Sequence, residues 1–343
     1  MGVLGATGAV GQRFIQLLDG HPLFELAELA ASDRSAGKPF GEACTWRLPG
    51  VPPPAVSGLV VSRCDVPFRS RLLFSGLDAS VAGELEAELA GRGHAVVSNA
   101  RNHRMDPDVP LLVPEINPQH LDALGVQRRR TGGGYIVTNP NCSVVGLALA
   151  LAPLQAAFGL EAVAVVTLQA LSGAGYPGVA SMDVADNVIP YIGGGEEEKI
   201  ESEPRRILGR YDGGFEPAPF PISASVHCVA VSDGHTMTVF VRPRLRADPA
   251  EAARVLAAFR GEPQERRLPS APERPIHVLG APDRPQPRLD REREHGMAVS
   301  VGRVRADAVF GLKLEALVHN TIRGAAGAAI LNAELLYARG LLP

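Results

Sequence analysis

The chain has 343 residues, of which 45% are hydrophobic and 21% are charged, and its formal net charge at pH 7 is −3. This balance is typical of a soluble globular protein, and the length exceeds what one compact core usually holds, so we expect two domains. A slightly acidic chain without a basic stripe argues against a nucleic-acid-binding protein.

The first residues of the sequence and its cysteines indicate the cellular compartment of the protein. The first residues, MGVLGATGAVG, lack the basic and apolar stretches of a secretory signal, and no apolar run reaches membrane-spanning length. No two of the four cysteines have the C-x-x-C spacing of a zinc or redox motif, so no metal site is expected. We therefore expect a cytoplasmic protein with reduced thiols.

Up to residue 139, short apolar runs alternate with helical patterns, as in RLLFSGL followed by VAGELEAELAGRG. Strands that alternate with helices predict parallel pairing, so we expect an N-terminal Rossmann-type α/β domain in residues 1–139. In the predicted helix 81–90, Val81, Leu85 and Leu89 recur every four residues, with glutamates at positions between them. This spacing predicts an apolar face on the sheet and acidic side chains on the other faces.

Residues 5–11 read GATGAVG and stand between a predicted strand and a predicted helix. The glycines Gly5, Gly8 and Gly11 allow a tight turn and let backbone N–H groups approach a pyrophosphate at a helix N-terminus. The alternative is a strand-to-helix turn without a ligand. Because the motif has a strand before it and a helix after it, nucleotide binding is the favoured interpretation.

The loop after the second predicted strand, SDRSAGK at 32–38, indicates which dinucleotide the domain binds. An acid here usually binds the ribose hydroxyls of NAD, so Asp33 favours NAD. Ser32, Arg34, Ser35 and Lys38 instead favour the additional phosphate of NADP, which needs several donors. We expect NADP, with a solvated loop as the alternative.

Cys142 lies in TNPNCS, where a predicted strand ends and an apolar helix begins. The unpaired N–H groups and the dipole at a helix N-terminus lower the pKa of a thiol and favour a nucleophilic thiolate. Asn141 beside it could donate a hydrogen bond to an oxyanion. The alternative is a small residue that packs well in a core, as free cysteines often do.

From residue 140 to residue 319 we expect an α+β domain with a mostly antiparallel sheet. Runs rich in β-branched residues occur at 161–168, 222–231, 236–242, 297–305 and 308–317. The proline-rich, charged segment 260–294 is predicted to be an exposed excursion. The terminal helix, within 320–343, is expected to return to the first domain and complete it.

His235 follows an Asp-Gly turn between two predicted strands in VAVSDGHTMTVFV, where its side chain would be held rigidly. A nucleophilic thiol needs a base, typically histidine, and most other histidines stand in polar loops. A hydrogen-bonded turn histidine is the alternative.

Several blocks together resemble the aspartate-β-semialdehyde dehydrogenase family, in its archaeal and fungal branch. They include GATGAVGQRF, ASDRSAGKPF, NPNCS, TLQALSGAGYPGV, NVIPYIGGGEEEKIE, VSDGHT and HNTIRGAAGAAILNAELL, in the family's order. The resemblance runs nearly end to end. Malonyl-coenzyme A reductases share much of the pattern and are close relatives.

The resemblance implies an NADP-dependent and phosphate-dependent reaction through a thioester. Cys142 would be the nucleophile, His235 the acid/base, and Gln169 the amide that orients the substrate. Arg104 and Lys199 match the family's phosphate ligands. The resemblance also implies a homodimer or homotetramer, whose second domain buries its sheet face between subunits.

Glu196 matches the acid that contacts the substrate's amino group, although acids at a helix start are favourable by themselves. The positions that match cofactor contacts are Gly5, Thr7, Gly8, Ala9, Val10, Ser32, Arg34, Ser35, Lys38, Ser75, Ser172, Gly173 and Asn320.

Cys228 departs from the family pattern. The family has an arginine seven positions before the catalytic histidine, where it binds the substrate's α-carboxylate, and this chain has Cys228 there. A thiol cannot replace a bidentate guanidinium. The alternatives are another arginine, a protonated His227, an acyl donor without that carboxylate, or a catalytically impaired paralogue. A reversible Cys142–Cys228 disulfide is a further alternative.

Overall fold

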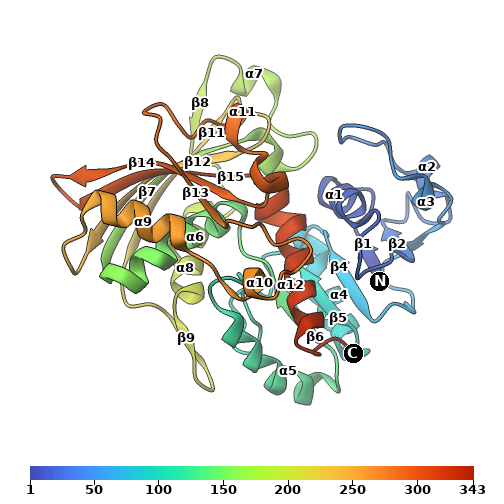
Figure 1. Ribbon diagram of the computed structural model, residues 1–343. Helices are drawn as coiled ribbons and strands as arrows, with labels where there is room; N and C mark the ends of the chain where they lie inside the picture. The colour runs from blue at the N-terminus through green and yellow to red at the C-terminus, as the bar shows by residue number, and fades with distance from the viewer. The chain divides into compact units, whose positions relative to one another are not determined.

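The computed structural model describes residues 1–343, which form two compact units (Figure 1). Unit 1 comprises residues 1–112, 119–140 and 325–343, and unit 2 comprises residues 113–118 and 141–324. The sequence predicts domain boundaries at 139/140 and 319/320. The chain instead changes units at 140/141 and 324/325, and the short segment 113–118 belongs to unit 2.

Unit 1 is built on a six-stranded sheet of order β3-β2-β1-β4-β5-β6 in which every pair is parallel. Its strands are β1 (Gly2–Leu4), β2 (Glu28–Ala31), β3 (Val61–Arg63), β4 (Leu72–Ser75), β5 (Ala95–Ser98) and β6 (Tyr135–Thr138). This is the strand order of the doubly wound dinucleotide-binding fold, so the predicted Rossmann-type domain is confirmed.

The helices of unit 1 pack on its strands and bury them. They are α1 (Ala9–Leu18), α2 (Phe40–Ala43), α3 (Pro54–Ser57), α4 (Ala79–Gly91), α5 (Leu124–Thr131) and α12 (Gly327–Ala338). Every residue of β4, β5 and β6 is buried, as expected for parallel strands that are covered on both faces. The terminal helix α12 packs against α1 and β5 within this unit.

Helix α4 differs from its predicted pattern. Val81 is 55% exposed, whereas Glu86 is fully buried. Its Oε1 atom accepts hydrogen bonds from Ser75 Oγ at 2.5 Å and Ser98 Oγ at 2.7 Å. Burial raises the pKa of Glu86 above its ordinary value, although both serine hydrogen bonds act in the opposite direction. The sequence predicts that Glu84, Glu86 and Glu88 all lie on faces of the helix other than the apolar one, and this prediction is wrong for Glu86.

Unit 2 contains a seven-stranded sheet of order β13-β14-β15-β12-β7-β11-β8. The β7/β11 and β13/β14 pairs are parallel, and the other four neighbouring pairs are antiparallel, so the predicted mostly antiparallel sheet is confirmed. Its strands are β7 (Leu160–Gln169), β8 (Val188–Pro190), β11 (Ile222–Val229), β12 (His235–Pro243), β13 (Ile276–Leu279), β14 (Val299–Asp307) and β15 (Gly311–Val318). Strands β9 (Arg210–Tyr211) and β10 (Phe215–Glu216) form a separate hairpin.

Helices cover one face of this sheet. Helix α6 (Cys142–Phe158) packs against β7, β12 and β15, while α8 (Glu196–Ile207) packs against β11 and α9 (Pro249–Ala258) against β13 and β14. Figure 1 shows these three helices gathered along one side of the sheet. On the opposite face of β7, Val166 and Leu168 are 37% and 41% exposed. The part of this face along β7 is therefore apolar and open within one chain.

The segment 260–294 is more integrated than its composition predicts. It contains α10 (Glu262–Glu265), the edge strand β13 and α11 (Pro287–Asp290). Asp290 is buried and forms ion pairs with Arg284 and Arg293. The predicted exposed excursion is therefore wrong, because a strand pairing and a buried ion cluster hold a segment with few apolar residues.

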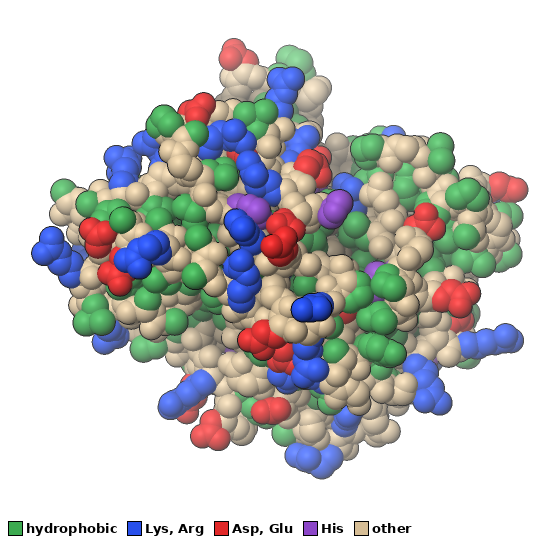
Figure 2. Space-filling view, viewed as in Figure 1, with side chains coloured by type: hydrophobic (Ala, Val, Ile, Leu, Met, Phe, Trp, Pro, Cys, Tyr) green, Lys and Arg blue, Asp and Glu red, His purple; other side chains and the backbone are tan.

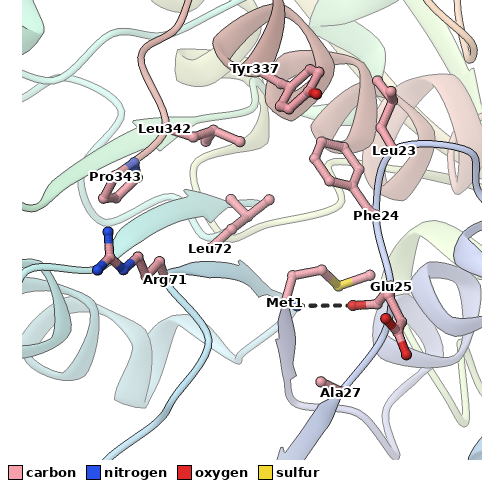
Figure 3. A pocket seen from close by; sticks show the side chains of 10 residues that line it. All are labelled: Met1, Leu23, Phe24, Glu25, Ala27, Arg71, Leu72, Tyr337, Leu342 and Pro343. Carbon is pink, nitrogen blue, oxygen red and sulfur yellow. Dashed lines mark hydrogen bonds between the residues drawn. The ribbon is translucent and has the colours of Figure 1, made fainter.

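A pocket of about 400 Å³ lies in unit 1 beside the amino-terminal ends of β1 and β4 (Figure 3). Its walls include Phe24, Leu72 and Tyr337. Dinucleotides bind outside the carboxyl ends of such strands, so this pocket is not the expected nucleotide site.

Short α7 (Ser181–Val184) precedes β8 in unit 2. No helix has both the length and the apolar composition needed to cross a membrane. Figure 2 shows basic and acidic side chains interspersed over the visible face, in keeping with the small net charge of −3.

Candidate functional site

Cys142 is the first residue of α6, as the sequence predicts. Asn141 caps the helix, because its Oδ1 atom accepts hydrogen bonds from the backbone N–H groups of Ser143 at 2.9 Å and Val144 at 3.4 Å. The backbone N–H of Asn141 in turn donates to Glu203 Oε2 at 2.7 Å. The thiol is thus held at a well-anchored helix N-terminus, a position that favours its thiolate form.

His235 is the histidine that reaches this thiol. Its Nε2 atom lies 3.2 Å from Cys142 Sγ, and its Nδ1 atom accepts a hydrogen bond from the backbone N–H of Ala170 at 2.9 Å. The side chain is fully buried. Burial lowers the pKa of His235 to about 4, although the negative charge of Glu196 acts in the opposite direction.

Three strands place a row of side chains beside the thiol. Gln169 on β7 is paired with Cys228 on β11, and the pairing of Thr236 with Leu168 puts His235 opposite Gln169. Neighbouring strands are about 4.8 Å apart, so Cys228, Gln169 and His235 form one continuous row on the covered face. All three are buried. The register thus brings together three residues that the sequence singled out separately.

Glu196, the first residue of α8, connects the row to the helix that carries Cys142. Its Oε1 atom accepts from Asn141 Nδ2 at 2.6 Å and lies 3.5 Å from Gln169 Nε2, while its Oε2 atom is 3.0 Å from Lys199 Nζ. Burial alone would raise the pKa of Glu196, but the charge of Lys199 and the hydrogen bond from Asn141 hold it below its ordinary value. The site therefore contains a charged carboxylate with a paired ammonium group.

Ser172, Gly173 and Asn320 surround the histidine. Asn320 accepts a hydrogen bond from the backbone N–H of Gly234 at 2.8 Å and donates one to Ser172 Oγ at 2.8 Å. A Cβ atom on Gly173 would lie 3.0 Å from His235 Cε1, so the position requires glycine or a shift of the ring. These three residues fix the turn that leads into His235.

In unit 1, the glycine-rich turn joins β1 to α1 and includes Thr7, and Ala9 and Val10 are the first two residues of α1. Gly5 has a φ of +73°, and a Cβ atom on Gly11 would lie 2.1 Å from the Gly5 carbonyl oxygen. The turn can therefore form only with glycine at these two positions. This close backbone approach fits the geometry that a pyrophosphate needs, and Ser75 ends the neighbouring strand β4.

The loop after β2 presents the expected cationic groups. Ser32, Arg34 and Lys38 are exposed, and Ser35 is buried in the turn. The Asp33 carboxylate lies 3.5 Å from Arg63 Nη1, at the end of β3. Arg63 therefore offsets the acid that favours NAD, a contribution that the sequence analysis missed because it depends on strand pairing.

Two family models match the chain: the NAD-binding domain of semialdehyde dehydrogenase over residues 1–124 and its dimerisation domain over residues 151–323. The aspartate-semialdehyde dehydrogenase of Methanothermobacter thermautotrophicus is 52% identical over 342 residues, covering 98% of both chains. That of Schizosaccharomyces pombe is 48% identical over 353 residues, covering 100% of this chain and 99% of the relative. The chain belongs to the aspartate-semialdehyde dehydrogenase family.

The three-dimensional comparison agrees with this family assignment. The crystal structure of aspartate-semialdehyde dehydrogenase with NADP from Candida albicans superposes with a TM-score of 0.91 at 44% identity, covering 99% of this chain and 98% of that one. The two relatives compared by sequence above are archaeal and fungal, as the sequence resemblance implies.

In this member of the aspartate-semialdehyde dehydrogenase family, the predicted site residues are divided between the two units. Arg104 is in unit 1, where it is buried and donates from Nη2 to the Asn99 carbonyl oxygen at 2.8 Å. The nucleophile, the histidine, Gln169 and the other proposed substrate ligands are in unit 2.

The structure also identifies two positions that sequence reasoning missed. A Cβ atom on Gly324 would lie 2.8 Å from Cys142 Cβ, so this glycine allows the segment after β15 to pack directly on the cysteine. Ala170 contributes only its backbone N–H, which no sequence pattern marks. The run of small residues in HNTIRGAAG predicts close packing around Gly324 but does not indicate that Cys142 is the residue it packs against.

Proposed function

We propose that this protein is an NADP-dependent aspartate-semialdehyde dehydrogenase. It interconverts L-aspartate 4-semialdehyde and 4-aspartyl phosphate through a thioester on Cys142. The observation that carries the proposal is the 3.2 Å approach of His235 Nε2 to Cys142 Sγ at the N-terminus of α6. Full-length similarity to relatives named for this activity supports it.

In the oxidative direction the Cys142 thiolate attacks the aldehyde carbon, forming a C–S bond and placing a negative charge on oxygen. When bound, NADP accepts a hydride from the reacting carbon. Cys142 then carries the acyl group as a thioester, and inorganic phosphate displaces the thiolate to release the acyl phosphate. Gln169, in the same row as His235, is placed to orient the acyl group.

We assign the two ends of the substrate from charge. Lys199 and Arg104 would bind phosphate, because cationic side chains form the strong charge-assisted hydrogen bonds that phosphate requires. Glu196, charged and linked to Asn141, would bind the substrate's ammonium group. Asn141 has its Oδ1 on the helix cap and an amide hydrogen on Glu196, so we assign it a positioning role beside the predicted oxyanion contact.

For the cofactor, the close-packed turn at Gly5 and Gly11 and the cationic loop after β2 support NADP binding in unit 1. Gly8, at the N-cap of α1, would face the pyrophosphate with them. Ser172, Gly173 and Asn320, beside His235, would hold the nicotinamide end.

Replacing both Arg34 and Lys38 by alanine should reduce the preference for NADP over NAD by at least about tenfold, because two donors to the 2′-phosphate are lost. The ratio of kcat/KM for the two cofactors measures this preference. Arg69→Ala, outside the loop, is the matched control. A wild-type protein that already prefers NAD would show that Asp33 decides the specificity.

The open face of the unit 2 sheet supports a homodimer or homotetramer, since Val166 and Leu168 leave an apolar surface uncovered. The family model for this region is described as a dimerisation domain. Catalysis by the Cys142 thiolate requires a reduced cysteine, which supports a reducing, cytoplasmic compartment.

Phosphate-dependent reduction of NADP with a panel of aldehydes tests the proposed function. Aspartate semialdehyde should be oxidised fastest, and omission of phosphate should stop turnover. A requirement for coenzyme A in place of phosphate would instead favour the malonyl-coenzyme A reductase-like alternative. Cofactor binding without turnover of any aldehyde would favour the catalytically impaired paralogue.

A further inference from the structure

The side-chain amide of Gln12 joins two segments of unit 1 that are distant in the sequence. Its Nε2 atom donates hydrogen bonds to the carbonyl oxygens of Thr7, at 3.0 Å, and Thr45, at 3.1 Å. Its Oε1 atom accepts a hydrogen bond from the backbone N–H of Arg47 at 2.7 Å. The side chain is buried, since Gln12 is only 2% exposed. One amide thus binds the glycine-rich turn to the segment 45–47 through backbone groups alone.

These contacts match the chemistry of a glutamine. Its amide has two N–H donors and one carbonyl acceptor, and here the donors face two carbonyl oxygens while the acceptor faces an N–H group. A carboxylate at position 12 would place an oxygen against the carbonyl oxygens of Thr7 and Thr45. A hydrocarbon side chain would leave all three backbone groups without this partner, which is costly in a buried position.

The bond to Thr7 helps to fix the shape of the glycine-rich turn. The peptide group between Thr7 and Gly8 is held at both ends, because its carbonyl oxygen accepts from Gln12 and its N–H donates to the Gly5 carbonyl oxygen at 3.0 Å. A peptide group is planar, so these two bonds determine its orientation. The orientation in turn directs the N–H groups at the start of α1, which a pyrophosphate would use.

The bonds to Thr45 and Arg47 hold the segment that follows the cationic loop 32–38 and α2. Trp46 lies between these two anchored residues, and its Nε1 atom is buried and has no hydrogen-bond partner. Gln12 therefore couples the turn that faces the pyrophosphate to the part of the chain that continues from the expected 2′-phosphate loop.

We propose that Gln12 is a positioning residue for the cofactor, which holds the glycine-rich turn and the segment 45–47 in the arrangement that binds the dinucleotide. Both of its N–H groups are engaged within the chain, so it acts through the backbone and not by donating to the cofactor. The inference rests on the NADP site of the proposed function. It concerns the pyrophosphate, which NADP and NAD share, whereas Arg34 and Lys38 are expected to discriminate between the two cofactors.

Two substitutions of Gln12 test this role. Gln12→Met keeps the length of the side chain without its N–H donors, and Gln12→Glu keeps the shape but replaces the donors with an acceptor. In both variants the Kd of NADPH should rise by at least about tenfold, because three hydrogen bonds are lost. The affinity for NADH should fall by the same factor. At saturating NADP, kcat should stay within about twofold of the wild type, since only cofactor binding is weakened.

Gln16→Met is the matched control. Gln16 is one turn further along α1, and its Nε2 atom lies 3.5 Å from the Pro49 carbonyl oxygen in an exposed position. A hydrogen bond this long and exposed contributes little, so the variant should bind NADPH with the affinity of the wild type.

Trp46 makes the position of the segment 45–47 measurable, because it is the only tryptophan of the chain. In both Gln12 variants of the full-length protein, its fluorescence emission should shift to longer wavelength as the indole becomes exposed to water. Gln16→Met should keep the emission of the wild type. This measurement needs no cofactor, so it tests the link between the two segments even if the wild type binds no NADPH, an outcome that would count against the proposed function.

Wild-type affinity for NADPH in either Gln12 variant would overturn the inference. A loss confined to Gln12→Glu would also overturn it, because a negative charge near the pyrophosphate would then be the cause. If Gln12→Met does not fold, Gln12→Glu remains decisive: a loss of affinity without a shift in the emission of Trp46 is an effect of charge alone and contradicts the positioning role.

Discussion

Cys142→Ser should abolish phosphate-dependent aldehyde oxidation, with a fall in kcat of more than about 10⁴-fold, as for other enzymes that lose their nucleophile. A serine hydroxyl is a far weaker nucleophile at neutral pH than a thiolate. Cofactor binding, measured by titration with the fluorescent reduced form NADPH, should stay at the wild-type level, because the glycine-rich turn belongs to unit 1.

Cys44→Ser is the matched control for this variant. Cys44 is a half-buried thiol at the end of α2 in unit 1, away from α6. It should retain activity. Normal turnover by Cys142→Ser would place the covalent chemistry on another residue and reject the proposed mechanism.

Cys228→Arg should lower KM for aspartate semialdehyde by at least about thirtyfold, the lower end of the value of a buried, charge-paired hydrogen bond. Cys228 is in the row with Gln169 and His235 and faces the covered side of the sheet. The sequence resemblance implies a carboxylate-binding arginine at this position. The thiol carries no charge there, since burial raises the pKa of Cys228. Steady-state kinetics at saturating NADP and phosphate measure the change.

Cys228→Met, which adds length without charge, controls for the effect of volume. If the natural acyl donor lacks an α-carboxylate at this point, the arginine would be an unpaired buried charge and would impair the natural reaction. The sign of the effect thus separates the two enzyme alternatives. Unchanged kinetics in both variants would show that position 228 does not face the substrate.

The sequence by itself determined the features that depend on neighbours along the chain. The strand-turn-helix at Gly5, the helix start at Cys142 and the Asp-Gly turn before His235 follow from local rules of glycine, capping and turn chemistry, and each is present in the structure. The five long apolar runs correspond to β7, β11, β12, β14 and β15 for the same reason.

Only the tertiary structure decided how distant segments meet. Hydrogen bonds from Ser75 and Ser98, which end two neighbouring strands, compensate the burial of Glu86. Segment 260–294 is joined to the sheet because its strand β13 pairs with β14. Likewise, the Ala170 N–H reaches His235 across 65 residues of sequence. Such contacts depend on strand register and on the absence of a Cβ atom at Gly173 or Gly324. A backbone N–H donor cannot be predicted from the sequence, because every residue except proline has one. The approach of His235 to Cys142 is therefore a property of the folded chain.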